Sequence, residues 1–85
     1  MEITYSNKFE KQYRKMSDDI RKLVVDKIAI FQNDCFDSRL KTHKLKGTLT
    51  GYYAFSLNNK YRIIFLFEND KNIRLHYIGT HDIYE

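Results

Sequence analysis

The 85-residue chain contains no proline, no tryptophan, three glycines and a single cysteine, Cys35. One cysteine cannot form the disulfide framework on which many small secreted domains depend. The chain also lacks a long apolar run and the basic, apolar and small segments of an N-terminal secretion signal. We therefore expect a cytoplasmic protein that has no contact with a membrane.

Apolar and aromatic side chains are abundant. The composition is 42% hydrophobic and 31% charged, with seven tyrosines and six phenylalanines. A chain of this length buries only about 60–65% of its unfolded surface, so most of its apolar residues must share one core. We expect a single domain over residues 1–85, stabilised mainly by its aromatic residues.

Positive charge is concentrated in the first half of the sequence. Residues 1–46 hold 11 of the 15 Lys and Arg but 7 of the 11 acids, and the net charge of +4 arises there. The segment 39–46 contains no acid, and its basic residues are Arg39, Lys41, His43, Lys44 and Lys46. This bias suits an anionic partner such as nucleic acid or an acidic protein segment, although a basic solvated surface would give the same count.

The first third of the chain predicts a short strand at residues 3–5 and two helices. Ser6 is a plausible N-cap for a helix over about residues 7–16, in which Phe9, Tyr13 and Met16 recur at helical spacing. Ser17 is the expected cap of a second helix that ends near residues 33–34, with acids in its first turn. Because the helices are nearly contiguous, they should form a hairpin.

The period changes to two from residue 52 onward. Three strands are predicted, separated by polar turns at residues 58–60 and 69–71, and Gly79 is expected to end the last one. Residues 61–67 are almost wholly apolar, which predicts a central strand covered on both faces. Residues 34–51 read as a polar connection. The fold class is therefore α+β: a strand, a two-helix hairpin and a three-stranded antiparallel meander, with the helices on one sheet face.

Arg62 is the only polar side chain between Tyr61 and Phe67. A charge in a central strand is costly unless an anion meets it. An ion pair, for example with Glu68, or a side chain that extends out of the sheet would be structural explanations. The functional explanation is a phosphate site, because the planar guanidinium fork matches phosphate oxygens.

The histidines become informative only as a set. RNA cleavage by its own 2′-hydroxyl needs a base, a cation at the phosphate and an acid for the leaving oxygen. His43, Arg62 and His81 would supply these three groups if the fold brings them together. His76 alternates with Tyr77 in a strand and reads as a surface residue without a role.

Other chemical signatures are missing from the sequence. Three scattered histidines and one cysteine give no zinc spacing, no Gly-rich phosphate loop follows a strand, and no cluster of acids suits Mg²⁺. We expect neither a metal nor another cofactor. Cys35 reads as a small core or loop residue.

Four short stretches carry a family resemblance: residues 43–47 (HKLKG), 51–53 (GYY), 61–65 (YRIIF) and 78–84 (IGTHDIY). In order and spacing they resemble the RelE/ParE superfamily of bacterial toxins, the small toxins of type II toxin–antitoxin pairs. The resemblance covers essentially the whole chain and implies a small RelE-like fold. In the RelE and YoeB/YafQ branches it implies a metal-independent, ribosome-dependent endoribonuclease, whereas ParE relatives poison DNA gyrase.

The resemblance also implies roles for individual residues. Arg62 matches the strand arginine that holds the scissile phosphate, and His43 matches a position where relatives carry a proposed base. His81 matches a proposed general acid or phosphate contact, and Tyr84 resembles a C-terminal aromatic residue that stacks on a base. Which histidine is the acid and which the base is left open. The lysines expected to bind RNA are Lys41, Lys44, Lys46 and Lys60.

The function implied is that of a toxin that cuts mRNA on the ribosome and is neutralised by a cognate antitoxin. Where RelE itself has two catalytic lysines, this chain has Tyr53 and Phe55, so its chemistry would resemble that of the histidine-using branches. A ParE-like gyrase inhibitor and a degenerate domain that only binds an antitoxin are the alternatives. The expected partners are an acidic antitoxin segment, mRNA and ribosomal RNA.

Overall fold

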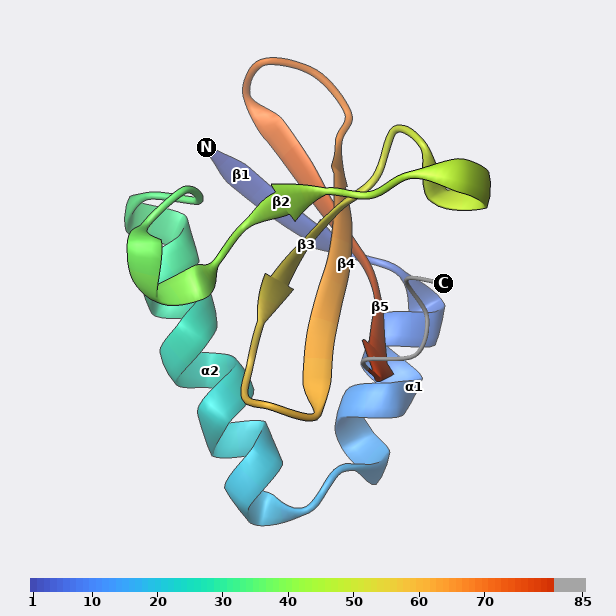
Figure 1. The fold of residues 1–85 in the computed structure, drawn as a ribbon. Coiled ribbons are helices and arrows are strands. Elements are labelled where there is room, and N and C mark those ends of the chain that lie inside the picture. The colour runs from blue at the N-terminus through green and yellow to red at the C-terminus, as the bar shows by residue number, and fades with distance from the viewer. Residues whose placement is uncertain (81–85) are drawn as a thin grey trace.

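The computed structural model of the chain describes residues 1–80, and its elements follow the order expected from the sequence (Figure 1). A short strand and two helices come first, and three longer strands end the described part. The bounds, with η for a short 3₁₀ helix, are β1 Glu2–Tyr5, α1 Asn7–Lys15, α2 Asp18–Asn33, η1 Ser38–Leu40, β2 His43–Lys44, η2 Gly47–Leu49, β3 Tyr53–Ser56, β4 Tyr61–Phe67 and β5 Asn72–Thr80.

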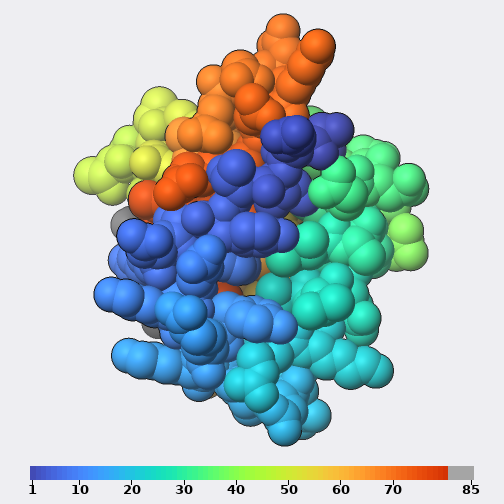
Figure 2. All heavy atoms as spheres, turned by 180° about the vertical axis from the view of Figure 1, so that it is seen from behind, coloured from blue at the N-terminus to red at the C-terminus, as the bar shows by residue number. Residues whose placement is uncertain are grey.

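Both α-helices begin at the serines that the sequence predicts as N-caps. The Oγ of Ser6 accepts the N–H of Phe9 at 3.0 Å, and the Oγ of Ser17 accepts the N–H of Ile20 at 3.4 Å. Each bond satisfies an amide that the first helical turn leaves without a partner. The two helices lie on the same side of the sheet and cover it in the view from behind, as predicted (Figures 1 and 2).

The five strands form one mixed sheet in the order β1-β5-β4-β3-β2. Strands β3, β4 and β5 are antiparallel neighbours, which confirms the predicted meander, while β1 runs parallel to β5. Strand β5 continues to Thr80, one residue beyond its predicted end at Gly79. The sequence does not predict β2, which lies within the expected polar connection, because two residues are too few to show an alternation.

Strand β4 lies at the centre of the sheet and is buried on both faces, as its apolar sequence predicts. On the helix side, the ring of Phe31 from α2 stacks on Phe55 with centroids 4.6 Å apart and meets the edge of Phe65 at 4.9 Å. The residues between β2 and β3 cover the other face. The cluster there consists of Leu45, Ala54 and Ile64, with Leu49, Tyr52 and Tyr77 packed against them.

Side chains near α1 hold strand β5 where β1 no longer pairs with it. The register of β1 and β5 ends at Leu75. The N–H of Ser6 donates to the Leu75 carbonyl at 3.0 Å, and the Ser6 hydroxyl donates to the His76 carbonyl. The Gln12 amide then accepts the N–H of Ile78 at 2.7 Å and donates to its carbonyl at 2.8 Å. The helix layer therefore fixes β5 almost to its end.

Candidate functional site

The sheet face that points away from the helices carries two of the residues expected at the site. Residues directly opposite each other on antiparallel strands share a face. His43 pairs with Ala54, which pairs with Ile64, and Arg62 pairs with Ser56. Because Ala54 and Ile64 belong to the cluster on the non-helical side, His43 and Arg62 lie on that side as well. We call this side the open face; it faces the viewer in Figure 1.

Arg62 is half-buried near the start of β4 and has small residues on both sides. Ser56 lies opposite it on β3 and Gly79 lies opposite it on β5. Its Nη1 donates to the carbonyl of Asn58 at 3.1 Å and to that of the preceding residue at 3.4 Å. An ion pair with Glu68, given above as an example of a structural explanation, does not form, since six residues of extended chain hold the two Cα atoms roughly 20 Å apart. The hydrogen bond to Asn58 directs the side chain toward the turn that precedes β4.

His43 is exposed on the short edge strand β2. Its Nδ1 lies 2.9 Å from the carbonyl oxygen of Lys41, whose φ of 54° is in the left-handed region. A carbonyl oxygen can only accept a hydrogen bond, so Nδ1 carries the proton in this contact. In the neutral ring the lone pair is then on Nε2, which is the nitrogen that can accept a proton.

The sheet register sets the spacing between the candidate groups. His43 and Arg62 are two strands and two residues apart, which corresponds to about 12 Å between their Cα atoms. His81 and Tyr84 lie outside the described residues. The last described residue, Thr80, pairs with Tyr61, the neighbour of Arg62.

Three of the four lysines expected to bind RNA are exposed in the segments next to β2 and β4. Lys60 lies in the turn before β4, with its Nζ 5.1 Å from the centroid of the Tyr61 ring. Lys41 and Lys46 flank strand β2. The contact of these three lysines with RNA stays a prediction.

Lys44 lies on the other side of the sheet edge. It pairs with Tyr53, whose ring packs against the core on the helix side. Because successive side chains of a strand alternate between faces, Lys44 points away from the face that carries His43. The binding of RNA by Lys44 also stays a prediction, and the contact would be made at the edge strand β2.

His76 is a partly buried residue of the open face for which the sequence predicts no role. Its ring centroid lies 5.2 Å from that of Tyr52 and 5.2 Å from that of Tyr77. Burial lowers the pKa of His76 below 6.5, and the cations Lys8 and Arg74 lower it further, so the ring is neutral at neutral pH. Only its place in a strand is visible from the sequence, and this does not reveal its ring contacts.

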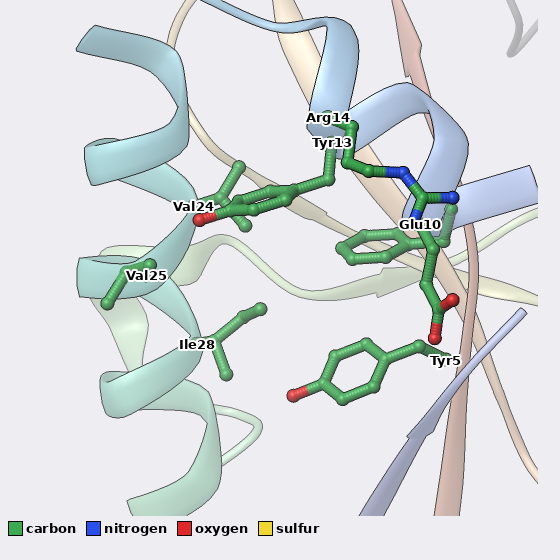
Figure 3. Close-up of a pocket in the computed structure, with 8 residues that line it drawn as sticks. Tyr5, Glu10, Tyr13, Arg14, Val24, Val25 and Ile28 are labelled. Carbon is green, nitrogen blue, oxygen red and sulfur yellow. The ribbon is translucent and has the colours of Figure 1, made fainter. Parts of the chain in front are cut away.

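A second feature lies on the helix side, where an apolar groove of about 410 Å³ separates the two helices (Figure 3). Side chains from β1, α1 and α2 point toward one another across it. Tyr5 is 41% exposed and Val25 is 55% exposed, although both are large apolar residues. The groove is lined by Tyr5, Phe9, Glu10, Tyr13, Arg14, Val24, Val25 and Ile28.

Two further kinds of site are missing from the described part of the chain. Within residues 1–80, no three His, Cys, Asp or Glu side chains gather closely enough to hold a metal ion. None of the helices in this range combines the length and apolarity needed to cross a bilayer.

Cys35 is partly buried against the core, and burial together with the charge of Asp34 raises the pKa of its thiol above 9.0.

The family described as "Bacterial toxin of type II toxin-antitoxin system, YafQ" matches residues 1–84. A comparison with curated protein sequences gave no match.

Solved toxin structures share the fold. A YoeB/ParE toxin from Agrobacterium tumefaciens superposes with a TM-score of 0.78 at 15% identity, covering 95% of this chain and 99% of that one. The toxin in a YoeB–YefM complex from Staphylococcus aureus gives 0.76 at 22% identity, covering 95% and 97%. YafQ from E. coli gives 0.66 at 24% identity, covering 94% and 92%. With the family match over nearly all its residues, this chain belongs to the YafQ family of bacterial type II toxins.

Proposed function

We propose that this toxin is a cytoplasmic, ribosome-dependent endoribonuclease that cuts mRNA and is neutralised by a cognate antitoxin. The observation that carries the proposal is the placement of Arg62 on the open face between Ser56 and Gly79, with His43 on the same face. The neighbours of Arg62 on both flanking strands, Ser56 and Gly79, are small. One of the two carbonyls that accept from Arg62, that of Asn58, lies in the exposed turn before β4, where a phosphate oxygen can replace it.

The proposed reaction is an attack of the ribose 2′-oxygen on the adjacent phosphorus. His43 Nε2 accepts the 2′-hydroxyl proton as the O2′–P bond forms, and His81 protonates the 5′-oxygen as the P–O5′ bond breaks. The products are a 2′,3′-cyclic phosphate and a 5′-hydroxyl. Arg62 stabilises the negative charge that accumulates on the phosphorane.

The hydrogen bond from His43 Nδ1 to the Lys41 carbonyl supports His43 as the base. It fixes the tautomer in which Nε2 accepts a proton, and it stabilises the imidazolium that forms. Tyr84 is proposed to stack on a neighbouring base, and Lys41, Lys44, Lys46 and Lys60 to bind RNA phosphates.

The antitoxin is proposed to be an acidic, apolar segment that becomes ordered as it binds. Complexes of the related YoeB toxin with YefM support such a partner. The groove between the helices offers apolar contacts through Tyr5, Tyr13 and Val25, with Arg14 at its edge. Acidic residues of the antitoxin would also be attracted by three further cations of α1, namely Lys8, Lys11 and Lys15.

The test compares two targets with one purified protein. The toxin is added to mRNA-programmed ribosomes and, separately, to a DNA gyrase supercoiling assay. Cuts with 2′,3′-cyclic or 3′-phosphate ends on ribosomes, lost in Arg62→Ala and His81→Gln but kept in the helix-side control Arg21→Ala, support the proposal. Inhibited supercoiling without mRNA cleavage would favour the ParE-like alternative. Antitoxin binding without either effect would favour the degenerate domain.

A further inference from the structure

A β-bulge determines which side chains of β5 reach the open face. Ile64 pairs with Tyr77, but the next residue of β4, Phe65, pairs with Leu75, so His76 is an extra residue in β5. Regular alternation would place Tyr77 on the same face as Leu75. The bulge instead leaves Leu75 in the helix-side core and puts Tyr77 on the open face.

The bulge is held in place from outside the strand. The Ser6 hydroxyl, which also caps α1, donates to the carbonyl of His76. Ser6 is itself buried at 8% exposure. Bulges of this kind commonly re-aim a side chain next to an active site.

The ring of His76 meets an aromatic residue from another part of the chain. Tyr52 comes from the segment that covers the centre of the open face, and its ring is tilted by 31° to that of His76 with centroids 5.2 Å apart. Both rings are only partly buried. Together they form a small aromatic surface, which we call the Tyr52/His76 shelf.

The shelf lies beside Arg62 on the same face. Gly79 is directly opposite Arg62, so Tyr77 is its diagonal neighbour, about 7–8 Å away between Cα atoms. The ring of Tyr77 adjoins that of His76. A single strand whose phosphate binds Arg62 can therefore pass over Tyr77 and reach the shelf.

The charges around the shelf suit a nucleic-acid backbone. The Nζ of Lys8 lies 4.6 Å from the centroid of the Tyr77 ring. Arg74 lies close enough to act on His76 electrostatically. Cations next to aromatic rings are the usual composition of surfaces that bind single-stranded RNA by stacking.

We propose that the Tyr52/His76 shelf stacks on an unpaired base of the mRNA adjacent to the phosphate held by Arg62. This subsite rests on the nuclease function proposed above and gives that site a base-binding position. His76 acts in it as an aromatic ring and takes no part in proton transfer. Stacking of one base on aromatic side chains strengthens binding by about 5- to 150-fold.

The experiment uses ribosomes programmed with an mRNA whose decoding-site codon carries 2-aminopurine and 2′-deoxyribose, so that it cannot be cut by 2′-hydroxyl attack. Stacking quenches 2-aminopurine fluorescence. We expect the wild-type toxin to quench it, His76→Ala to need about 5- to 150-fold more protein for the same quenching, and His76→Phe to behave like the wild type. Equal quenching by the wild type and His76→Ala would overturn the proposal, as would a loss in His76→Phe equal to that in His76→Ala.

Two controls separate stacking from structure. Phe36→Ala removes an aromatic ring that is 57% exposed and packs against Tyr53 on the helix side, and it should leave quenching unchanged. Thermal unfolding is measured for each variant. If His76→Ala does not fold, Tyr52→Leu decides, and wild-type quenching by it would overturn the proposal.

Cleavage of the all-ribose mRNA is measured in parallel. A toxin that quenches fluorescence but does not cut refutes the nuclease function and leaves the shelf as a base-binding site. A toxin that cuts but whose quenching is unaffected by His76→Ala refutes the shelf alone.

Discussion

The contact between Gln12 and strand β5 predicts a large loss of stability from a single polar truncation. Gln12 bonds both backbone groups of Ile78, at 2.7 and 2.8 Å, beyond the point where β1 stops pairing with β5. Ile78 is only 4% exposed, so Gln12→Ala would leave its N–H and carbonyl without these partners in a buried place. The strand affected is the one that carries Tyr77 and Gly79 onto the open face.

The magnitude follows from the two bonds. Each contributes about 0.5–1.5 kcal/mol net, and an unpaired buried group costs more, so we expect a loss of about 2–3 kcal/mol. In a chain of this size that corresponds to a fall in Tm of about 10–20 °C. Gln12→Glu keeps the acceptor for the Ile78 N–H but loses the donor to the Ile78 carbonyl at neutral pH. Its Tm should therefore lie between that of the wild type and that of Gln12→Ala. Its Tm should rise toward that of the wild type as the carboxyl becomes protonated, because a carboxylic acid can donate again.

The assay is thermal unfolding followed by circular dichroism. Gln32→Ala is the matched control, because the Gln32 side chain makes one exposed bond to the carbonyl of Met1 at 2.7 Å. We expect this variant to shift Tm by less than about 3 °C. If Gln12→Ala changed Tm no more than Gln32→Ala, the reasoning about β5 would be refuted.

Three further predictions concern titratable groups. The pKa of His76 is lowered in the folded chain, so the unfolded chain binds a proton more readily. The stability of the fold should therefore fall as the pH drops through about 6.5. The Tm of His76→Phe should depend less on pH in this range. Hydrogen bonds from Arg39 lower the pKa of Asp37 to about 2, and Arg39→Ala should return it toward 3.8 in a carbon-detected NMR titration. The raised pKa of the Cys35 thiol should make it react more slowly with Ellman's reagent in the folded than in the unfolded chain at pH 7, and equal rates would contradict this.

Much of the fold is visible in the sequence because its signals are local. Ser6 and Ser17 mark the helix starts, and the change of period after the helices marks the meander. Strand β2 could not be predicted, because its two residues acquire their strand geometry only by pairing with β3. The bulge at His76 is invisible for a related reason: it depends on how β5 registers with β4, and a regular alternation hides it.

In the candidate site, too, some features are visible in the sequence and others depend on how the strands pair. Arg62 is conspicuous in the sequence as a lone charge in an apolar strand. The prediction that this strand is central is confirmed. That His43 shares its face could not be derived, because the face depends on the register of the unpredicted strand β2. The contact of His76 with Tyr52 joins residues from different parts of the chain, and no spacing in the sequence predicts it.

The most direct test of the account is the rate at which the toxin cuts ribosome-bound mRNA when Arg62 is replaced. Loss of a group that stabilises the transition-state charge typically lowers the rate by about 100- to 1,000-fold, and we predict this for Arg62→Ala, with Arg62→Lys between it and the wild type because lysine keeps the charge without the planar fork. Thermal unfolding of both variants is measured in parallel, so that a loss of cleavage is compared between folded proteins. Cleavage by Arg62→Ala at the wild-type rate would contradict the account.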